Sequence, residues 1–146
     1  MKGHGKVYSR IERDADGFPP VAVERVWAMP TEGGLDVVDN IPFFARAAAL
    51  GGTVAVEVDG GRRWYRATAK ASANSLLRVL VLEGAAADEV AAVLERFGCG
   101  FERDATDWLF AVNVPPEASL RAVLTYLTAL AAGGHLTYEG VLLRRA

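Results

Sequence analysis

The sequence predicts an α+β protein in which a small antiparallel β-barrel is followed by a βαββαβ half. Three observations support this fold class. Residues 1–72 contain five short stretches in which apolar and polar residues alternate, separated by turn-forming residues. Residues 73–146 combine such stretches with two segments whose apolar residues recur every three or four positions, as on one face of a helix. The 146 residues suffice for one compact domain or two very small ones that share a core.

In residues 1–72, glycine, proline and aspartate mark the turns between the expected strands. Pro-Pro at 19–20 and Asp-Gly at 59–60 are typical of such turns. In the second strand, Trp27 is expected on the buried face, and Pro42 favours a brief helical turn at 42–50. Five short antiparallel strands in this length are typical of a small SH3-like barrel. The expected strands are residues 7–13, 21–29, 35–38, 54–58 and 62–71.

Residues 73–146 are expected to fold as a ferredoxin-like half, in which two helices cover one face of an antiparallel sheet. A linker at 71–75 leads into it. In the first helix, Val90, Val93, Leu94 and Phe97 form one apolar stripe, and Gly98 is a suitable C-cap. The second helix is expected to open at Pro115-Pro116 and to close at Gly133-Gly134. The expected strands are residues 76–82, 99–104, 108–114 and 136–144.

Composition excludes several classes of protein. No apolar run approaches the ~20 residues that a membrane helix requires, so no membrane partner is expected. The basic N-terminus is not followed by the apolar segment of a signal peptide. A single cysteine fits a reducing compartment, and a cytoplasmic location is therefore expected. The net charge of −2 gives no general attraction to nucleic acid or acidic lipid.

Several short motifs carry a resemblance to a known family. They are Glu24 and Trp27 in Glu-Arg-Val-Trp, the run Asp-Asn-Ile-Pro-Phe-Phe at 39–44, Gly-x-x-Val at 51–54, and Tyr-Glu at 138–139. On these residues the chain resembles, over nearly its whole length, a bacterial family catalogued as domain of unknown function 4265. The resemblance implies kinship with that family and brings no established activity with it.

One position departs from the pattern of this family. Members typically have Gly-Asp immediately before the valine-rich strand, whereas Gly52 stands here where the acidic residue would be. If that acidic residue acts in other members, this protein lacks the corresponding function.

Motifs for metal, cofactor or nucleophile chemistry are not found in the sequence. Cys99 is expected as a buried core thiol, because it follows a helix-ending glycine and begins an alternating strand. Neither histidine, His4 near the N-terminus or His135 beside a Gly-Gly turn, is an evident base partner for it. No cluster of histidine, cysteine or carboxylate has the spacing of metal ligands, so no metal site is expected. The paired glycines follow no nucleotide-binding pattern, and no cofactor is expected.

A basic hairpin is the strongest candidate for nucleic-acid binding, because small barrels bind single strands with such surfaces. Two arguments weigh against it. Residues 1–72 carry 10 basic and 9 acidic side chains, and positive charges on an exposed hairpin often protect a sheet edge. Nucleic acid is therefore not the expected partner. The hairpin residues are Arg62, Arg63, Trp64, Tyr65, Arg66 and Lys70.

Four polar residues are the expected ligand-binding residues: Glu24, Asn40, Arg78 and Glu139. Arg78 interrupts an apolar strand, so its charge either reaches solvent at the sheet edge or meets a carboxylate, as a structural salt bridge or in a binding role. Asp39 and Asn40 precede Pro42 and most simply cap the short helix. All four are expected to line a groove between the two halves, where pockets preferentially form.

Two classes of function follow from this set of residues. The leading one is a non-catalytic binding, accessory or regulatory module that engages a small molecule, a peptide or another protein. The alternative is an enzyme of unknown reaction that uses carboxylates and Arg78 in the same groove. The sequence leaves assembly into a homo-oligomer open.

Overall fold

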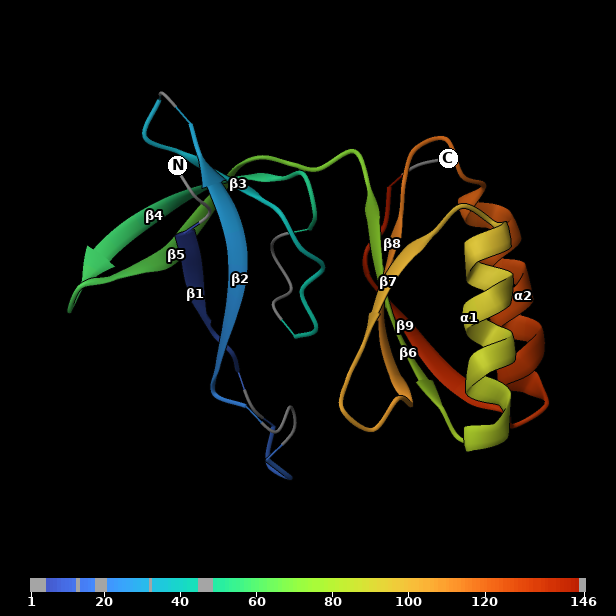
Figure 1. Ribbon diagram of the computed structural model, residues 1–146. Coiled ribbons are helices and arrows are strands. Elements are labelled where there is room, and N and C mark those ends of the chain that lie inside the picture. Colours follow the sequence, from blue (N-terminus) through green and yellow to red (C-terminus); the bar gives the residue numbers. More distant parts are fainter. Residues whose placement is uncertain (1–4, 13, 18–20, 32, 45–48, 145–146) are drawn as a thin grey trace. The chain divides into compact units, whose positions relative to one another are not determined.

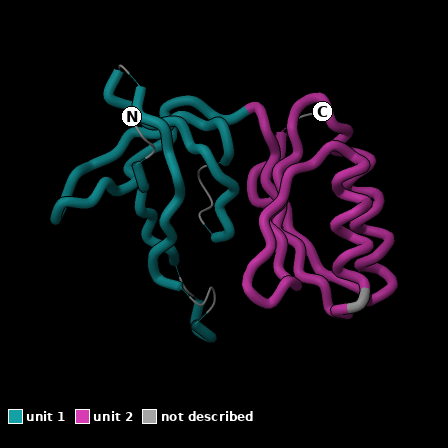
Figure 2. Tube along the Cα trace, in the orientation of Figure 1, with its two compact units in different colours: residues 1–72 teal, residues 73–146 magenta. Residues whose placement is uncertain are grey.

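The computed structural model describes residues 5–12, 14–17, 21–31, 33–44 and 49–144. The chain divides into two compact units, unit 1 at residues 1–72 and unit 2 at residues 73–146 (Figures 1 and 2). The protein is therefore a mixed α+β chain, with a closed five-stranded barrel in unit 1 and a sheet with two helices in unit 2. Neither of the α-helices among the described residues is long and apolar enough to span a membrane.

Unit 1 is a barrel whose five strands follow one another in space as they do in sequence. At the β4–β5 hairpin, Gly60 and Gly61 have φ angles of 61° and 78°, as the two central residues of a type I′ turn require. The core of the barrel is small and consists largely of valine and alanine: Val7, Val26, Ala28, Val38 and Val54. The strands are β1 (Gly5–Arg10), β2 (Val23–Pro30), β3 (Asp36–Val38), β4 (Thr53–Asp59) and β5 (Arg62–Lys70).

The barrel closes through a parallel pairing of β1 with β5, so the prediction of a wholly antiparallel barrel was wrong at this seam. The register there pairs Val7 with Arg63 and Tyr8 with Trp64. The reason is topological. Each hairpin of an up-and-down barrel reverses the chain direction, so the first and fifth strands run the same way and can only pair in parallel.

The predicted place of Trp27 on the buried face of β2 was also wrong. Trp27 is 46% exposed, and its neighbours Val26 and Ala28 point into the barrel instead. The interior of a five-stranded barrel is narrow, so valine and alanine fit where an indole ring does not. The sequence predicts Phe43 and Phe44 at the barrel core or between the two halves; both are half-buried and lie against each other with ring centroids 6.1 Å apart.

The helical turn predicted at 42–50 falls in the segment between β3 and β4. Residues 45–48 lie outside the described residues, and the described positions 41–44 are not helical. Asn40, expected to cap that turn, instead accepts a hydrogen bond from the main-chain N–H of Trp27 at 2.8 Å.

Unit 2 has one four-stranded antiparallel sheet in the order β7-β8-β6-β9. Both helices, α1 and α2, cover the same face of this sheet (Figure 1). The core lies between the sheet and the helices, and it is built from side chains such as Leu77, Leu94, Phe110 and Leu127. The elements are β6 (Ser75–Val81), a short 3₁₀ helix η1 (Gly84–Ala86), α1 (Ala87–Arg96), β7 (Gly100–Arg103), β8 (Leu109–Val114), α2 (Leu120–Ala132) and β9 (Leu136–Leu142).

The ends of the helices follow local capping chemistry. Gly98, just past α1, has a φ of 85°, which suits the glycine that commonly ends a helix. The start of α2 differs from the prediction, because Pro115-Pro116 form a turn and the helix begins at Leu120. Ser119 is its N-cap and accepts a hydrogen bond from the N–H of Ala122 at 3.1 Å, which satisfies one of the unpaired amides at the helix start.

Candidate functional site

Arg78 lies on the face of the unit 2 sheet that the helices leave uncovered, here called the helix-free face. Side chains alternate between the two faces of a strand. Leu77 and Val79 belong to the core under the helices, so Arg78 between them points to the opposite face. On the neighbouring strand β8, Ala111 is the register partner of Arg78 and points the same way. A cation therefore sits near the middle of a sheet on a face without helices.

The Arg78 charge meets a carboxylate. Arg78 and Glu139 are register partners on β6 and β9, and Nη2 of Arg78 donates to Oε1 of Glu139 in an ion pair. The two partners differ in exposure: the side chain of Arg78 is 7% exposed and that of Glu139 is 40% exposed. Two of the predicted site residues are thus in direct contact, and the pair places a buried guanidinium beside a partly hydrated carboxylate.

A further polar residue of this face was not predicted from the sequence. Asn113 on β8 is the register partner of Leu76, one row along the sheet from Arg78. It is buried, and its Oδ1 atom has no hydrogen-bond partner among the described residues. Such an acceptor is costly unless something supplies a donor. The only signal in the sequence is an asparagine inside an otherwise apolar strand.

Glu24 and Asn40, the other two predicted residues, lie together in unit 1 and hold the family-like segment 39–44 against β2. The carboxylate of Glu24 accepts the main-chain N–H groups of Phe43 and Phe44 at 2.6 and 3.0 Å. Asn40 accepts the N–H of Trp27, and the N–H of Asp39 donates to the carbonyl of the same tryptophan at 2.8 Å. Both side chains accept hydrogen bonds from main-chain N–H groups, so they fix the main-chain conformation of the segment.

The four predicted residues therefore divide into two pairs by position, one pair in each unit, and among these described residues only the pair in unit 2 is in direct contact. Within unit 1, Glu24 and Asn40 fix one segment; within unit 2, Arg78 and Glu139 form one ion pair. That the two pairs line a single groove stays a prediction from the sequence.

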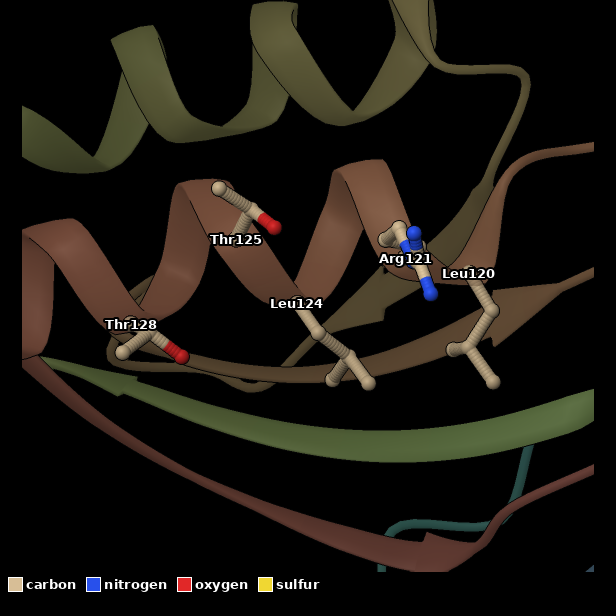
Figure 3. A pocket seen from close by; sticks show the side chains of 5 residues that line it. All are labelled: Leu120, Arg121, Leu124, Thr125 and Thr128. Atoms are coloured by element: carbon tan, nitrogen blue, oxygen red, sulfur yellow. The ribbon is translucent and has the colours of Figure 1, made fainter. Parts of the chain in front are cut away.

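A surface hollow of about 430 Å³ lies along α2 (Figure 3). Its lining comes from a single helix and contains one charged side chain, that of Arg121. Two leucines and two threonines complete it. Since one helix face with a single titratable group offers no acid–base pair, the hollow has no apparent catalytic chemistry. The lining residues are Leu120, Arg121, Leu124, Thr125 and Thr128.

The described residues contain no group of three or more His, Cys, Asp or Glu side chains that could hold a metal ion. Nδ1 of His135 lies 3.0 Å from Oε1 of Glu83 at an exposed position, whereas Cys99 is buried in the unit 2 core. The thiol of Cys99 lies in the core, whereas the imidazole of His135 lies at the surface. The prediction that Cys99 is a core thiol is confirmed.

Burial also controls the reactivity of Cys99, because it raises the pKa of the thiol from 9.0 to about 11. We expect iodoacetamide to leave Cys99 unmodified in the folded protein at pH 8 and to alkylate it rapidly after denaturation in urea. The folded state holds this proton more tightly than the unfolded state. The contribution of the thiol to stability is therefore complete below pH 9.0 and is lost as the pH rises toward 11. Rapid alkylation without denaturant would contradict this assignment; mass spectrometry measures it.

The comparison with protein families decides the kinship of the chain. A family model described as a domain of unknown function, DUF4265, matches residues 24–138. The chain belongs to this family. The matched range begins at Glu24 and contains Asn40, Arg78 and Asn113, while Glu139 follows directly after its last residue. The resemblance predicted from the short motifs is thereby confirmed.

A solved structure with a similar fold is the crystal structure of a hypothetical protein from Neisseria gonorrhoeae. It is similar to this DUF4265 protein with a TM-score of 0.83 and 22% sequence identity, over 100% of this chain and 98% of that chain. This likeness shows the fold alone. No curated protein matches the chain.

Proposed function

We propose that this protein is a non-catalytic binding or accessory module whose ligand is a small molecule, a peptide or another protein. The proposed contact surface is the helix-free face of unit 2 around Arg78 and Asn113. The observation that carries the proposal is the buried Oδ1 atom of Asn113, which has no hydrogen-bond partner among the described residues. Buried polar groups are almost always paired, so an acceptor left in this state favours a partner from outside the chain.

The chemistry of this face restricts the ligand. Asn113 would accept a hydrogen bond, so the ligand should carry an N–H or O–H donor, as a peptide amide or a hydroxyl does. Leu76, the register partner of Asn113, is buried, whereas Leu80 further along the same strand is 41% exposed and provides apolar contact area. A ligand with one donor and an apolar part matches this pattern, which is common in small-molecule sites.

The predicted carboxylates favour binding over catalysis. Glu139 pairs with Arg78, and Glu24 accepts two main-chain amides. A general base must instead reach a proton of the substrate. In this proposal Glu139 orients Arg78, and Glu24 and Asn40 keep the segment 39–44 in a fixed shape in which the rings of Phe43 and Phe44 are half-buried.

We further infer that unit 1 is SH3-like and unit 2 is ferredoxin-like. The inference for unit 2 rests on the element order βαββαβ and the antiparallel strand order β7-β8-β6-β9. For unit 1 it rests on five short strands in a closed barrel. Both folds serve many unrelated functions, so they add no ligand to the proposal. The single cysteine favours action in the bacterial cytoplasm.

Asn113→Leu tests the proposal, because leucine has a similar branched shape and no polar atom. We expect the variant without ligand to be more stable than the wild type by about 1 kcal/mol, since an unpaired buried acceptor is removed. Amino acids, dipeptides and hydroxy acids would be screened for a rise in melting temperature. The affinity of any compound found, measured by calorimetry, should fall about tenfold or more in Asn113→Leu.

Two further variants sharpen this test. Arg78→Met removes the charge and keeps much of the volume; because Glu139 is 40% exposed and can be hydrated, we expect a modest loss of stability and a clear loss of affinity. Thr125→Val, at an exposed position of α2, is the control and should change neither. A destabilised Asn113→Leu protein, or ligand affinity that is the same in all variants, would contradict the proposal.

A further inference from the structure

We propose that the outer surface of the barrel, where β1 lies between β2 and β5, binds single-stranded nucleic acid (Figure 1). The proposal concerns unit 1 and is independent of the helix-free face of unit 2. It rests on three aromatic rings that alternate with cations on these adjoining strands. We call this set the aromatic–cation surface; its members are Lys6, Tyr8, Arg10, Trp27, Arg62 and Trp64.

The alternation of the strands places these side chains outside the barrel. Val7 and Val26 point into the core, so Lys6, Tyr8 and Trp27 beside them point outward. The register then brings the strands together: Lys6 is paired with Trp27 across β1 and β2, and Tyr8 with Trp64 across β1 and β5. Residues distant in the sequence thus form one continuous surface.

Each ring of this surface lies close to a cation. Lys6 Nζ lies 4.7 Å from the ring centroid of Trp27, Arg62 Cζ 5.0 Å from that of Tyr8, and Arg10 Cζ 4.0 Å from that of Trp64. The Tyr8 and Trp64 rings also contact each other, with centroids 5.5 Å apart. A guanidinium that lies over a ring keeps in-plane N–H donors for phosphate oxygens, so these interactions hold the cations in place without consuming their donors.

The charged members of the aromatic–cation surface are all cations. The outward positions of β1 and β2 that flank Tyr8 add a further cation, Arg25, which is its register partner. Among the described outward positions of β1 and β2 no residue is acidic, whereas β4 places two exposed carboxylates, Glu57 and Asp59, in register with Trp64 and Arg62. The balance of ten basic and nine acidic residues in unit 1 therefore conceals a local excess of positive charge.

Rings and cations together distinguish a nucleic acid from an acidic peptide. An acidic peptide would be recognised by the cations alone. Single-stranded nucleic acid uses both parts, because its bases stack on aromatic side chains and its phosphates bind lysine and arginine. Trp27 is 46% exposed despite its size, and such an indole is suited to stacking with a base.

The closed barrel also removes an argument against this function. Positive charges on the hairpin could protect an open sheet edge, but β5 is hydrogen-bonded to β4 on one side and to β1 on the other at Arg63 and Trp64. A strand paired on both sides has no edge to protect at that point. Arg62, next to this seam, lies over Tyr8 instead.

The test uses the full-length protein with fluorescent oligothymidylate and oligouridylate of about ten nucleotides as probes. We expect binding that weakens as salt rises and that quenches tryptophan emission. Trp27→Leu should weaken binding about tenfold. Arg10→Gln with Arg62→Gln should weaken it by a similar factor and reduce the slope of log affinity against log salt by about 1.4, or about 0.7 for each phosphate that is no longer neutralised.

Matched controls lie on unit 2. Trp108→Leu removes another indole that is 46% exposed, and Arg96→Gln with Arg121→Gln removes the same charge from the exposed faces of α1 and α2. Both should bind like the wild type, and circular dichroism should show every variant folded. The proposal is overturned if the wild type does not bind either probe, if the controls are weakened as much as the barrel variants, or if polyglutamate competes equally well and Trp27→Leu has no effect.

Discussion

Replacing Arg63 with methionine is expected to lower the free energy of unfolding by about 3–5 kcal/mol. Arg63 on β5 forms a bidentate ion pair with Asp36 on β3, with Nη2–Oδ1 at 2.5 Å and Nε–Oδ2 at 3.2 Å. These strands are not neighbours, because β4 lies between them in the barrel. Asp36 is 1% exposed, so without Arg63 its carboxylate would stay buried beside apolar residues and lose its charged partner.

Removing the charge of Asp36 instead, in Asp36→Asn, should lower the free energy of unfolding by less. The side chain of Arg63 is 38% exposed, and in Asp36→Asn it can turn toward water. In the double variant Asp36→Leu with Arg63→Met, much of the loss should be recovered, because no charge remains in the interior. Arg62→Met, at the neighbouring exposed position, is the control and should change stability by less than about 0.5 kcal/mol. Urea denaturation measures all four; equal effects of Arg62→Met and Arg63→Met would refute the explanation.

The sequence predicted the fold well where apolar periodicity was strong. The alternating valines of β4 and the apolar stripe of α1 gave the correct element types, because a period of two fits a strand and a period of three to four fits a helix, although Val58 of β4 is 66% exposed. Trp27 was misplaced because the alternation in β2 allows two assignments: either Val26 or Trp27 can lie on the buried face. The narrow barrel interior, which no local pattern contains, selects the smaller side chain.

The candidate site was predicted less completely. Arg78 was identifiable because a charge inside an apolar strand demands a partner, but its partner Glu139 lies 61 residues away and follows only from sheet order. Asn113 gave a weaker signal, since an uncharged amide in a strand is ordinary until its burial and missing partner are known. The aromatic–cation surface could not be predicted from the sequence, because only the register of β1 with β2 and β5 brings its residues from three strands together.

Phe110→Ala is expected to destabilise unit 2 by about 3–5 kcal/mol. Phe110 on β8 is the largest fully buried side chain among the described residues. Its ring lies 5.4 Å from that of Phe101 on β7, and Arg103 Cζ lies 4.9 Å from its centroid. Alanine would leave a cavity against the sheet and helices that these neighbours cannot fill, so the loss combines transfer and cavity terms.

The shape of this loss can be tested with two further variants. Phe110→Leu keeps most of the volume and should lose less than half as much stability as Phe110→Ala. Trp108→Ala removes a larger side chain two residues away, but one that is 46% exposed, so it should lose much less. Urea denaturation followed by far-ultraviolet circular dichroism gives the order. Equal destabilisation by Trp108→Ala and Phe110→Ala would contradict the assignment of Phe110 to the core beneath α1 and α2 and of Trp108 to the surface.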